Sequence, residues 1–180
     1  MRIKIVVVVS VMLVAFQPAF SQEGVSVAEV SAGYSFLRDF DLHSNGHGWI
    51  GALGLNLNSK FAVWGEVSGI HGLIDAPSGC ISCSPGDGRV HSFMGGPQFT
   101  LRTNPRVTPF VHVFLGGARR GSAGQSATDL AMQLGGGTDF WLRSGLGVRI
   151  GGDYRHIFAD LDATDAFRFQ SGLVFRFGRR

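Results

Sequence analysis

The two cysteines are the residues whose spacing most directly suggests chemistry. Cys80 and Cys83 form a Cys-x-x-Cys pair, an arrangement found in redox sites and as half of a zinc site. A redox site needs a helix N-terminus to lower the pKa of one thiol, whereas this pair lies in a stretch rich in Pro, Gly and Ser. In an exported chain we therefore expect a structural disulfide, with zinc bound by the pair, His71 and His91 as the alternative.

Other groups that could do chemistry are weaker candidates. Of the six histidines, only His112 falls in the middle of a predicted strand, and an interior histidine with satisfied hydrogen bonds is a simpler interpretation than a catalytic base. The run Gly135–Gly137 lacks the following Lys and helix that a phosphate-binding loop requires. We predict no cofactor.

The N-terminus predicts export. Two basic residues precede an apolar run over residues 5–16, which is shorter than the roughly 20 residues of a membrane-spanning helix. Small residues, Ala19 and Ser21, then stand where a signal peptidase inspects the chain. We predict a cleaved signal peptide at residues 1–21 and a single domain over residues 22–180.

Composition narrows the class of protein further. The formal charge of +3 falls to +1 when Arg2 and Lys4 leave with the signal peptide, so there is no case for a nucleic-acid partner. Glycine supplies 27 of 180 residues, about twice the usual share of roughly 7%. That much glycine suits a narrow, strongly curved sheet in which side chains are crowded.

Eight segments in which apolar and polar residues alternate must position these groups. They cover about residues 27–36, 47–57, 61–71, 90–102, 109–118, 129–141, 145–156 and 166–177. The connections between them are alternately long and short, as in barrels with short periplasmic turns and long outer loops. The sequence therefore predicts an all-β fold, an eight-stranded antiparallel up-and-down transmembrane β-barrel. We expect a bulge at Pro97, which has no N–H for the ladder.

The polar faces of these strands must point into the barrel. A basic side chain facing the middle of a bilayer costs about 2–4 kcal/mol, and a charge inside the barrel is costly unless it is paired. We predict that acids and bases pair across the lumen and leave no continuous water channel, Glu29, Glu66 and Asp153 meeting Arg149, Arg155 and Arg168. The full lumenal network comprises Glu29, Glu66, His112, Asp139, Arg149, Asp153, Arg155 and Arg168.

The outer face and the loops carry two further predictions. Aromatic residues near the strand ends should form the girdles at the membrane surfaces, namely Tyr34, Phe36, Trp49, Phe61, Phe99, Phe140, Trp141, Tyr154 and Phe177. Arg119 and Arg120 are predicted to lie in an outer loop over residues 119–126, where they could contact lipopolysaccharide phosphates.

The end of the chain carries the most specific pattern. Gln170, Gly172, Phe175 and Phe177 resemble the C-terminal signal of bacterial outer-membrane β-barrels, which in that family is read by the barrel-assembly machinery. The family usually ends on the aromatic residue, whereas three residues follow Phe177 here. With the alternating segments at 135–140 and 148–155, the mature chain is similar to the small outer-membrane barrels of the OmpA transmembrane-domain and OmpX-like type.

The resemblance implies a monomer in the outer membrane, in contact with lipids and lipopolysaccharide, that serves a structural role or binds a surface ligand through its outer loops. It implies no enzymatic activity. One alternative is a lipid A-modifying barrel enzyme using His91 with Ser92, or His156 with Asp160, although neighbouring residues of a strand point to opposite faces. The other alternative is a soluble lipocalin-like barrel with its apolar residues inside.

Overall fold

The computed structural model describes residues 26–39, 45–72, 89–122, 125–158 and 164–179. The predicted signal peptide, the cysteine pair Cys80 and Cys83, and Asp160 lie outside these residues, so those predictions stay predictions.

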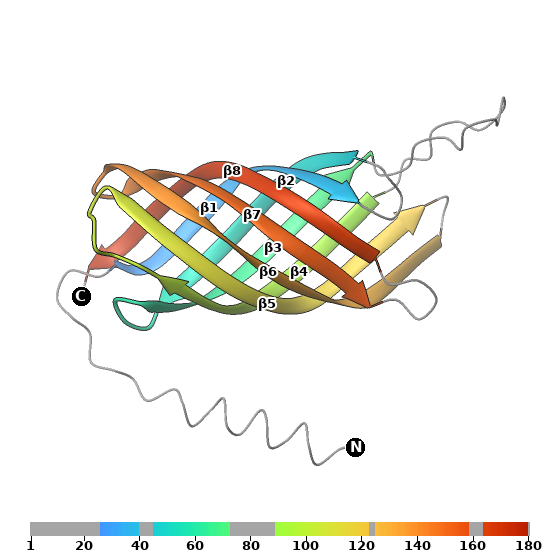
Figure 1. The fold of residues 1–180 in the computed structure, drawn as a ribbon, viewed down its shortest axis with the longest axis horizontal. Helices are drawn as coiled ribbons and strands as arrows, with labels where there is room; N and C mark the ends of the chain where they lie inside the picture. Colours follow the sequence, from blue (N-terminus) through green and yellow to red (C-terminus); the bar gives the residue numbers. More distant parts are fainter. Residues whose placement is uncertain (1–25, 40–44, 73–88, 123–124, 159–163, 180) are drawn as a thin grey trace, which may run out of the picture.

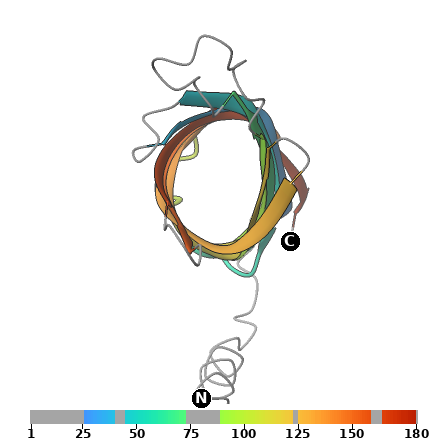
Figure 2. The same ribbon diagram turned by 90° about the vertical axis from the view of Figure 1, so that its right-hand side faces the viewer.

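Eight antiparallel strands close into one barrel in sequence order, which confirms the predicted fold class (Figure 1). The ladder between the first and last strands completes the ring seen in Figure 2. The barrel has a turn end, which holds the start of β1, the end of β8 and the three short connections, and a loop end opposite to it. The strands are β1 (Ser26–Asp39), β2 (Asn45–Asn56), β3 (Phe61–His71), β4 (Arg89–Thr100), β5 (Val107–Ser122), β6 (Gln125–Arg143), β7 (Leu146–Phe158) and β8 (Thr164–Arg179).

Side chains alternate strictly between the two faces of the barrel because successive residues of a strand point to opposite sides. Large apolar side chains lie outside, such as Phe93 with 62% of its surface exposed, whereas Arg155 and Arg168 are 0% exposed inside. This is the reverse of a soluble barrel that carries an apolar ligand, so the lipocalin-like alternative is not supported. Among the described residues, no helix is long and apolar enough to cross a bilayer.

The β5–β6 hairpin is longer than the sequence pattern predicted. Arg119 pairs with Thr128 and Arg120 with Ala127 in a ladder that continues to Ser122 and Gln125. The prediction that the two arginines lie in an outer loop was therefore wrong. The small polar residues that suggested a loop are compatible with a ladder, because the backbone hydrogen bonds of a hairpin do not depend on apolar side chains.

The bulge expected at Pro97 was also wrong. The register of β4 with β5 is the same on both sides of it, Gly95 facing Leu115 and Gln98 facing His112. The ladder omits its pairs at Gly96 and Pro97 without inserting a residue, so the missing N–H is accommodated in register. The irregularity lies instead in the β6–β7 ladder, between Trp141 and Arg143.

The girdle prediction failed for Trp141, which is only 8% exposed. Its indole Nε1 donates a hydrogen bond to Thr108 Oγ1 at 3.0 Å, inside the barrel. Alternation places Trp141 on the same face as Asp139, the buried residue two positions before it, and proximity to the strand end does not change that face. The other eight aromatic residues of the predicted girdles are exposed on the outside.

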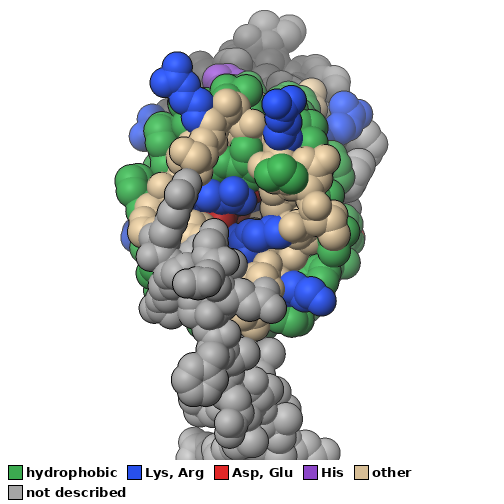
Figure 3. All heavy atoms as spheres, turned by 90° about the vertical axis from the view of Figure 1, so that its left-hand side faces the viewer, with side chains coloured by type: hydrophobic (Ala, Val, Ile, Leu, Met, Phe, Trp, Pro, Cys, Tyr) green, Lys and Arg blue, Asp and Glu red, His purple; other side chains and the backbone are tan. Residues whose placement is uncertain are grey.

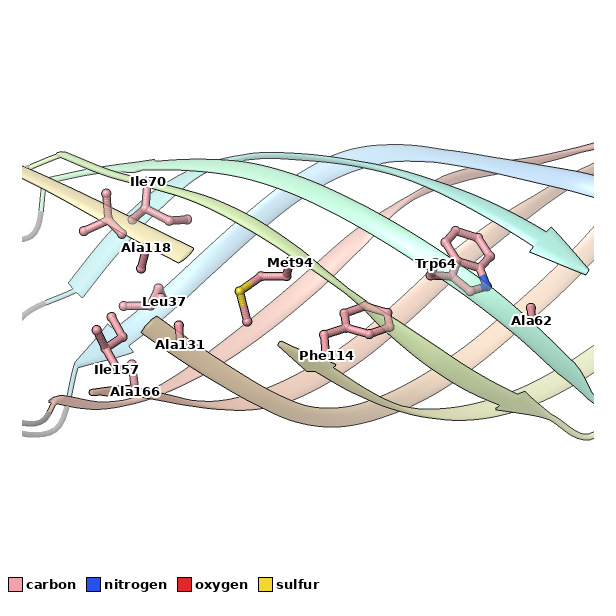
Figure 4. Close-up of a cluster of buried hydrophobic side chains, with 11 residues drawn as sticks. Leu37, Ala62, Trp64, Ile70, Met94, Phe114, Ala118, Ala131, Ile157 and Ala166 are labelled. Carbon is pink, nitrogen blue, oxygen red and sulfur yellow. The ribbon is translucent and has the colours of Figure 1, made fainter. Parts of the chain in front are cut away.

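An apolar layer fills the lumen near the loop end, and sequence reasoning did not predict it. Figure 4 shows Leu37, Ile70, Ala118, Ile157 and Ala166 gathered at one end, away from Trp64 and Ala62. These residues come from the loop ends of strands that are far apart in the sequence. Below, "apolar layer" means Leu37, Ile70, Val90, Ala118, Ala131, Ile157 and Ala166, all of them buried.

Candidate functional site

The centre of the lumen is organised around Arg168 of β8. Its Nη1 and Nη2 donate hydrogen bonds to the two carboxylate oxygens of Glu66 on β3, at 2.6 and 2.9 Å. Its Nε and Nη2 donate to Asp153 Oδ2 on β7, at 3.0 and 2.5 Å. One buried guanidinium therefore binds two buried carboxylates, and the bidentate geometry toward Glu66 is the strongest form of this pairing.

Arg155 of β7 extends this cluster toward β4. Its Nη2 lies 3.7 Å from Glu66 Oε1 and donates to Gln133 Oε1 at 2.8 Å. Its Nη1 donates to Ser92 Oγ at 3.0 Å. Because β7 and β3 lie four strands apart in an eight-stranded ring, the contact between Arg155 and Glu66 crosses the lumen.

His112 of β5 lies beside the same cluster. Its Nε2 is 3.0 Å from Asp153 Oδ1, and its ring stacks on Phe114 with a centroid distance of 4.2 Å. A cavity of about 10 Å³ adjoins it, between Trp64, Gln98 and Arg149. That is room for about one water molecule.

A second cluster lies closer to the turn end. Arg149 binds both carboxylate oxygens of Asp139 at 2.7 and 2.8 Å. Its guanidinium carbon lies over the rings of Trp64 and Phe110, at 4.2 and 4.5 Å from their centroids. Arg149 Nη2 is also 4.0 Å from Glu29 Oε2, which connects this pair to the mouth of the barrel.

Glu29 is held mainly by two arginines that the predicted network left out. Arg102 Nη2 and Arg176 Nε lie 2.9 and 3.2 Å from Glu29 Oε1. Arg176 also stacks on Trp141 at 3.3 Å. Alternation would have found both arginines, because Arg102 shares a face with Gln98 and Arg176 shares one with Arg168.

All eight residues of the predicted lumenal network are thus buried inside the barrel, but they form two clusters. Glu66 and Asp153 both meet Arg168, and Arg155 lies 3.7 Å from Glu66. Of the three arginines predicted to pair with these acids, Glu29 is close only to Arg149. The distance from Arg149 Nη2 to Glu29 Oε2 is 4.0 Å, the limit for an ion pair.

Of the pairs considered for catalysis, the structure describes both members only for His91 and Ser92, and they point to opposite faces. Ser92 Oγ is inside the barrel, 2.7 Å from Ser68 Oγ, whereas His91 lies on the outer face of the same strand. His156 Nδ1 is 2.6 Å from Asp165 Oδ1, and the pair of His156 with Asp160 stays untested because Asp160 lies outside the described residues. Within the part of the chain that the structure describes, no three His, Cys, Asp or Glu side chains are placed to hold a metal ion.

The C-terminal motif forms the seam that closes the barrel. Gln170 Nε2 donates to Asp153 Oδ2 at 3.2 Å, while Phe175 and Phe177 are exposed outside. Gly172 faces Gly33 of β1 across the closing ladder. A Cβ at Gly172 would lie 2.7 Å from the Cα of Gly33, so the two strands can approach this closely only with glycine here.

Known proteins share this closed barrel. A family model described as outer membrane protein beta-barrel domain matches residues 6–177. Neisserial surface protein A superimposes with a TM-score of 0.66 at 13% identity, over 83% of this chain and 96% of that chain. No curated protein sequence matches significantly.

Two further solved structures have the same fold. Ail, the attachment invasion locus protein of Yersinia pestis, has a TM-score of 0.51 at 21% identity, over 87% of this chain and 100% of that one. The N-terminal barrel of OprF from Pseudomonas aeruginosa has a TM-score of 0.54 at 13% identity, over 84% and 98%. At these identities the likeness concerns the fold.

Proposed function

Because this chain belongs to the outer membrane protein beta-barrel family and is an outer-membrane protein, we propose that it acts there as a non-enzymatic structural or surface-interaction protein whose lumen is closed. The observation that carries the proposal is the ion-paired cluster across the lumen. Arg168 of β8 and Arg155 of β7 both reach Glu66 of β3, at 2.6 and 3.7 Å. A general porin instead encloses a water-filled channel.

Two other levels of the lumen support closure. On the loop side of the cluster lies the apolar layer, which offers no polar groups to a hydrated ion. On the turn side, the guanidinium of Arg149 lies over the ring of Trp64 and that of Phe110. An ion would have to displace buried pairs at one level and shed its water at another.

Planar-bilayer recording tests the closed lumen. The purified, folded protein is expected to give no large, stable conductance, while a general porin reconstituted in the same lipid serves as positive control. Long-lived, ohmic openings that scale with the amount of inserted protein would refute closure. Heat-modifiable migration on a denaturing gel verifies that the inserted protein is folded.

The absence of enzymatic activity is proposed on the separation of the candidate groups. His91 lies outside the barrel and Ser92 inside it, bound to Ser68 and Arg155. The expected result is that incubation with lipopolysaccharide leaves its acyl chains unchanged by mass spectrometry. A shortened or added acyl chain would show that the lipid A-modifying alternative is correct.

The proposed surface interaction concerns the loop end. Arg38, Arg89 and Arg119 are exposed there on three different strands, and guanidinium groups bind sulfate and phosphate well. A structure of Ail from Yersinia pestis contains the heparin analogue sucrose octasulfate, so this compound is the first probe to use. The triple variant Arg38→Gln, Arg89→Gln, Arg119→Gln should be retained less than the wild type on a sucrose octasulfate matrix. Equal retention of the two proteins would refute this ligand class.

The last strand carries the residues proposed to direct assembly of the barrel. We propose that the barrel-assembly machinery reads Gln170, Gly172, Phe175 and Phe177, and that the folded protein is a monomer. Phe175 and Phe177 are exposed on the outer face of the last strand, where a partner can contact them. Replacing both by Ser should reduce the amount of folded protein in isolated outer membranes, and an unchanged amount would contradict the assignment.

A further inference from the structure

The three short turns repeat one chemical arrangement. Each has an exposed leucine followed by an exposed base, and none contains an acidic residue. The leucines are 38%, 43% and 66% exposed at positions 57, 101 and 142. We use "turn rim" for these six residues: Leu57 and Lys60 between β2 and β3, Leu101 and Arg106 between β4 and β5, and Leu142 and Arg143 at the end of β6, where the chain turns into β7.

The charge of the turn rim is set by Lys60, Arg106 and Arg143. Among the described residues, no acid lies within ion-pair distance of Lys60, Arg106 or Arg143. Inside the mouth, Arg102 and Arg176 share the single carboxylate of Glu29. Figure 3 shows this end of the barrel with Lys and Arg side chains around the mouth and little acidic surface between them. The described turn end therefore has an excess of positive charge.

The turn rim lies next to the apolar band of the barrel. Phe61 and Phe99 contact each other edge to face on the outside of β3 and β4, with ring centroids 5.2 Å apart. Lys60 immediately precedes Phe61, and Leu101 follows Phe99 by two residues. Aromatic side chains of this kind mark the edge of the hydrocarbon layer, so the bases lie at the depth of the lipid phosphates.

We propose that the turn rim is a binding surface for anionic phospholipid headgroups in the leaflet that it meets, which is the periplasmic leaflet in this family. The bases would bind the phosphates while the exposed leucines insert among the first acyl carbons. A soluble acidic polymer could neutralise the bases but would leave the leucines in water. The pairing of leucine with base at every turn thus favours a lipid over a peptide or a glycan.

The expected selectivity follows from the number of bases. Each Lys or Arg near an anionic surface favours binding by about fivefold. Three of them acting together correspond to a preference on the order of 100-fold for an anionic over a zwitterionic phospholipid, at low salt.

Native mass spectrometry of the folded full chain measures this preference directly. The protein is released from detergent after incubation with equal amounts of phosphatidylglycerol and phosphatidylcholine. The wild type is expected to retain phosphatidylglycerol, and the Lys60→Gln, Arg106→Gln, Arg143→Gln variant to lose most of the preference. The matched control removes three charges at the loop end, as Arg38→Gln, Arg89→Gln and Arg119→Gln, and is expected to keep it.

If the two triple variants lose the preference for phosphatidylglycerol equally, total charge decides lipid binding and the proposal is overturned. A preference that survives in the turn-rim variant would overturn it too. Rim-dependent sedimentation with purified cell-wall sacculi, without any lipid preference, would assign the surface to an acidic polymer and would overturn it as well. If the triple variant does not fold, each single variant should still lose about fivefold.

Discussion

Arg168→Met is the substitution that most directly tests the lumenal charge cluster. It removes the bidentate pair with Glu66 at 2.6 and 2.9 Å and the contacts with Asp153. Glu66 then keeps only Arg155, at 3.7 Å, and Asp153 keeps His112, at 3.0 Å. Both carboxylates remain fully buried, so one of the two has no adequate cation.

Removing one partner of a buried pair costs about 3–5 kcal/mol, because an uncompensated charge is left in a medium of low dielectric constant. Glu66 loses two hydrogen bonds and keeps one cation at 3.7 Å, while Asp153 loses two and keeps His112 and the neutral amide of Gln170. The expected loss of unfolding free energy therefore lies within that range. Met replaces only the aliphatic part of the Arg side chain, so the space left by the guanidinium adds a cavity contribution to this loss.

The assay is equilibrium urea unfolding of the barrel in lipid vesicles, followed by tryptophan fluorescence and by heat-modifiable gel migration. The matched double variant Arg168→Met, Asp153→Asn removes one base and one acid, and so restores charge balance between Arg155 and Glu66. It should be more stable than Arg168→Met alone. A cost below about 1 kcal/mol for the single variant, the range of a solvent-exposed pair, or a double variant that is no better, would refute the reasoning.

Three further predictions use the same unfolding assay. Gly172→Val should cost about 1–3 kcal/mol of unfolding free energy, because the new side chain meets the backbone of β1. The control Gly65→Val should cost little, because nothing lies within 4 Å of a Cβ there. Equal costs would contradict the close approach of β1 and β8 at Gly172. Leu134 is exposed near the middle of β6, so Leu134→Arg should lower the free energy of unfolding in the bilayer by about 2–4 kcal/mol. Leu142→Arg at the turn end should lower it by about 0–1 kcal/mol. The reverse order would mean that the hydrocarbon layer does not surround the middle of β6. Asp129→Asn breaks a partly exposed ion pair of 2.8 Å and should cost no more than about 1 kcal/mol, so a larger loss would show that this hairpin is more rigid than its exposure suggests.

Pairing in the lumen shows where sequence reasoning reached its limit. Alternation identified the inward residues, including Arg168 and Glu66, but these are 102 positions apart in the chain. Which acid an inward arginine reaches depends on strand tilt, register and ring closure, and no local pattern records these. Glu29 illustrates the consequence, because its partners Arg102 and Arg176 come from β4's turn and from β8.

The errors had different origins. Trp141 was assigned to the outer girdle on its position near a strand end, although its place two residues after Asp139 already put it inside. The arginines at 119 and 120 were assigned to a loop on composition, and only the ladder with β6 showed that they belong to a strand. The apolar layer was missed for another reason. Its seven members come from seven strands, and no single strand shows a pattern that marks them.

The amino-acid sequence by itself determined the number of strands, their two faces and the alternation of long and short connections, because a pleated strand turns successive side chains to opposite sides whatever its neighbours are. Only the tertiary structure decided which inward groups meet and where the three turns bring their bases together. It also decided how the lumen is divided into a charged centre, the level at which Arg149 lies over Trp64 and Phe110, and the apolar layer. Those properties arise when eight tilted strands close with one register, and closure relates residues that no local interaction connects.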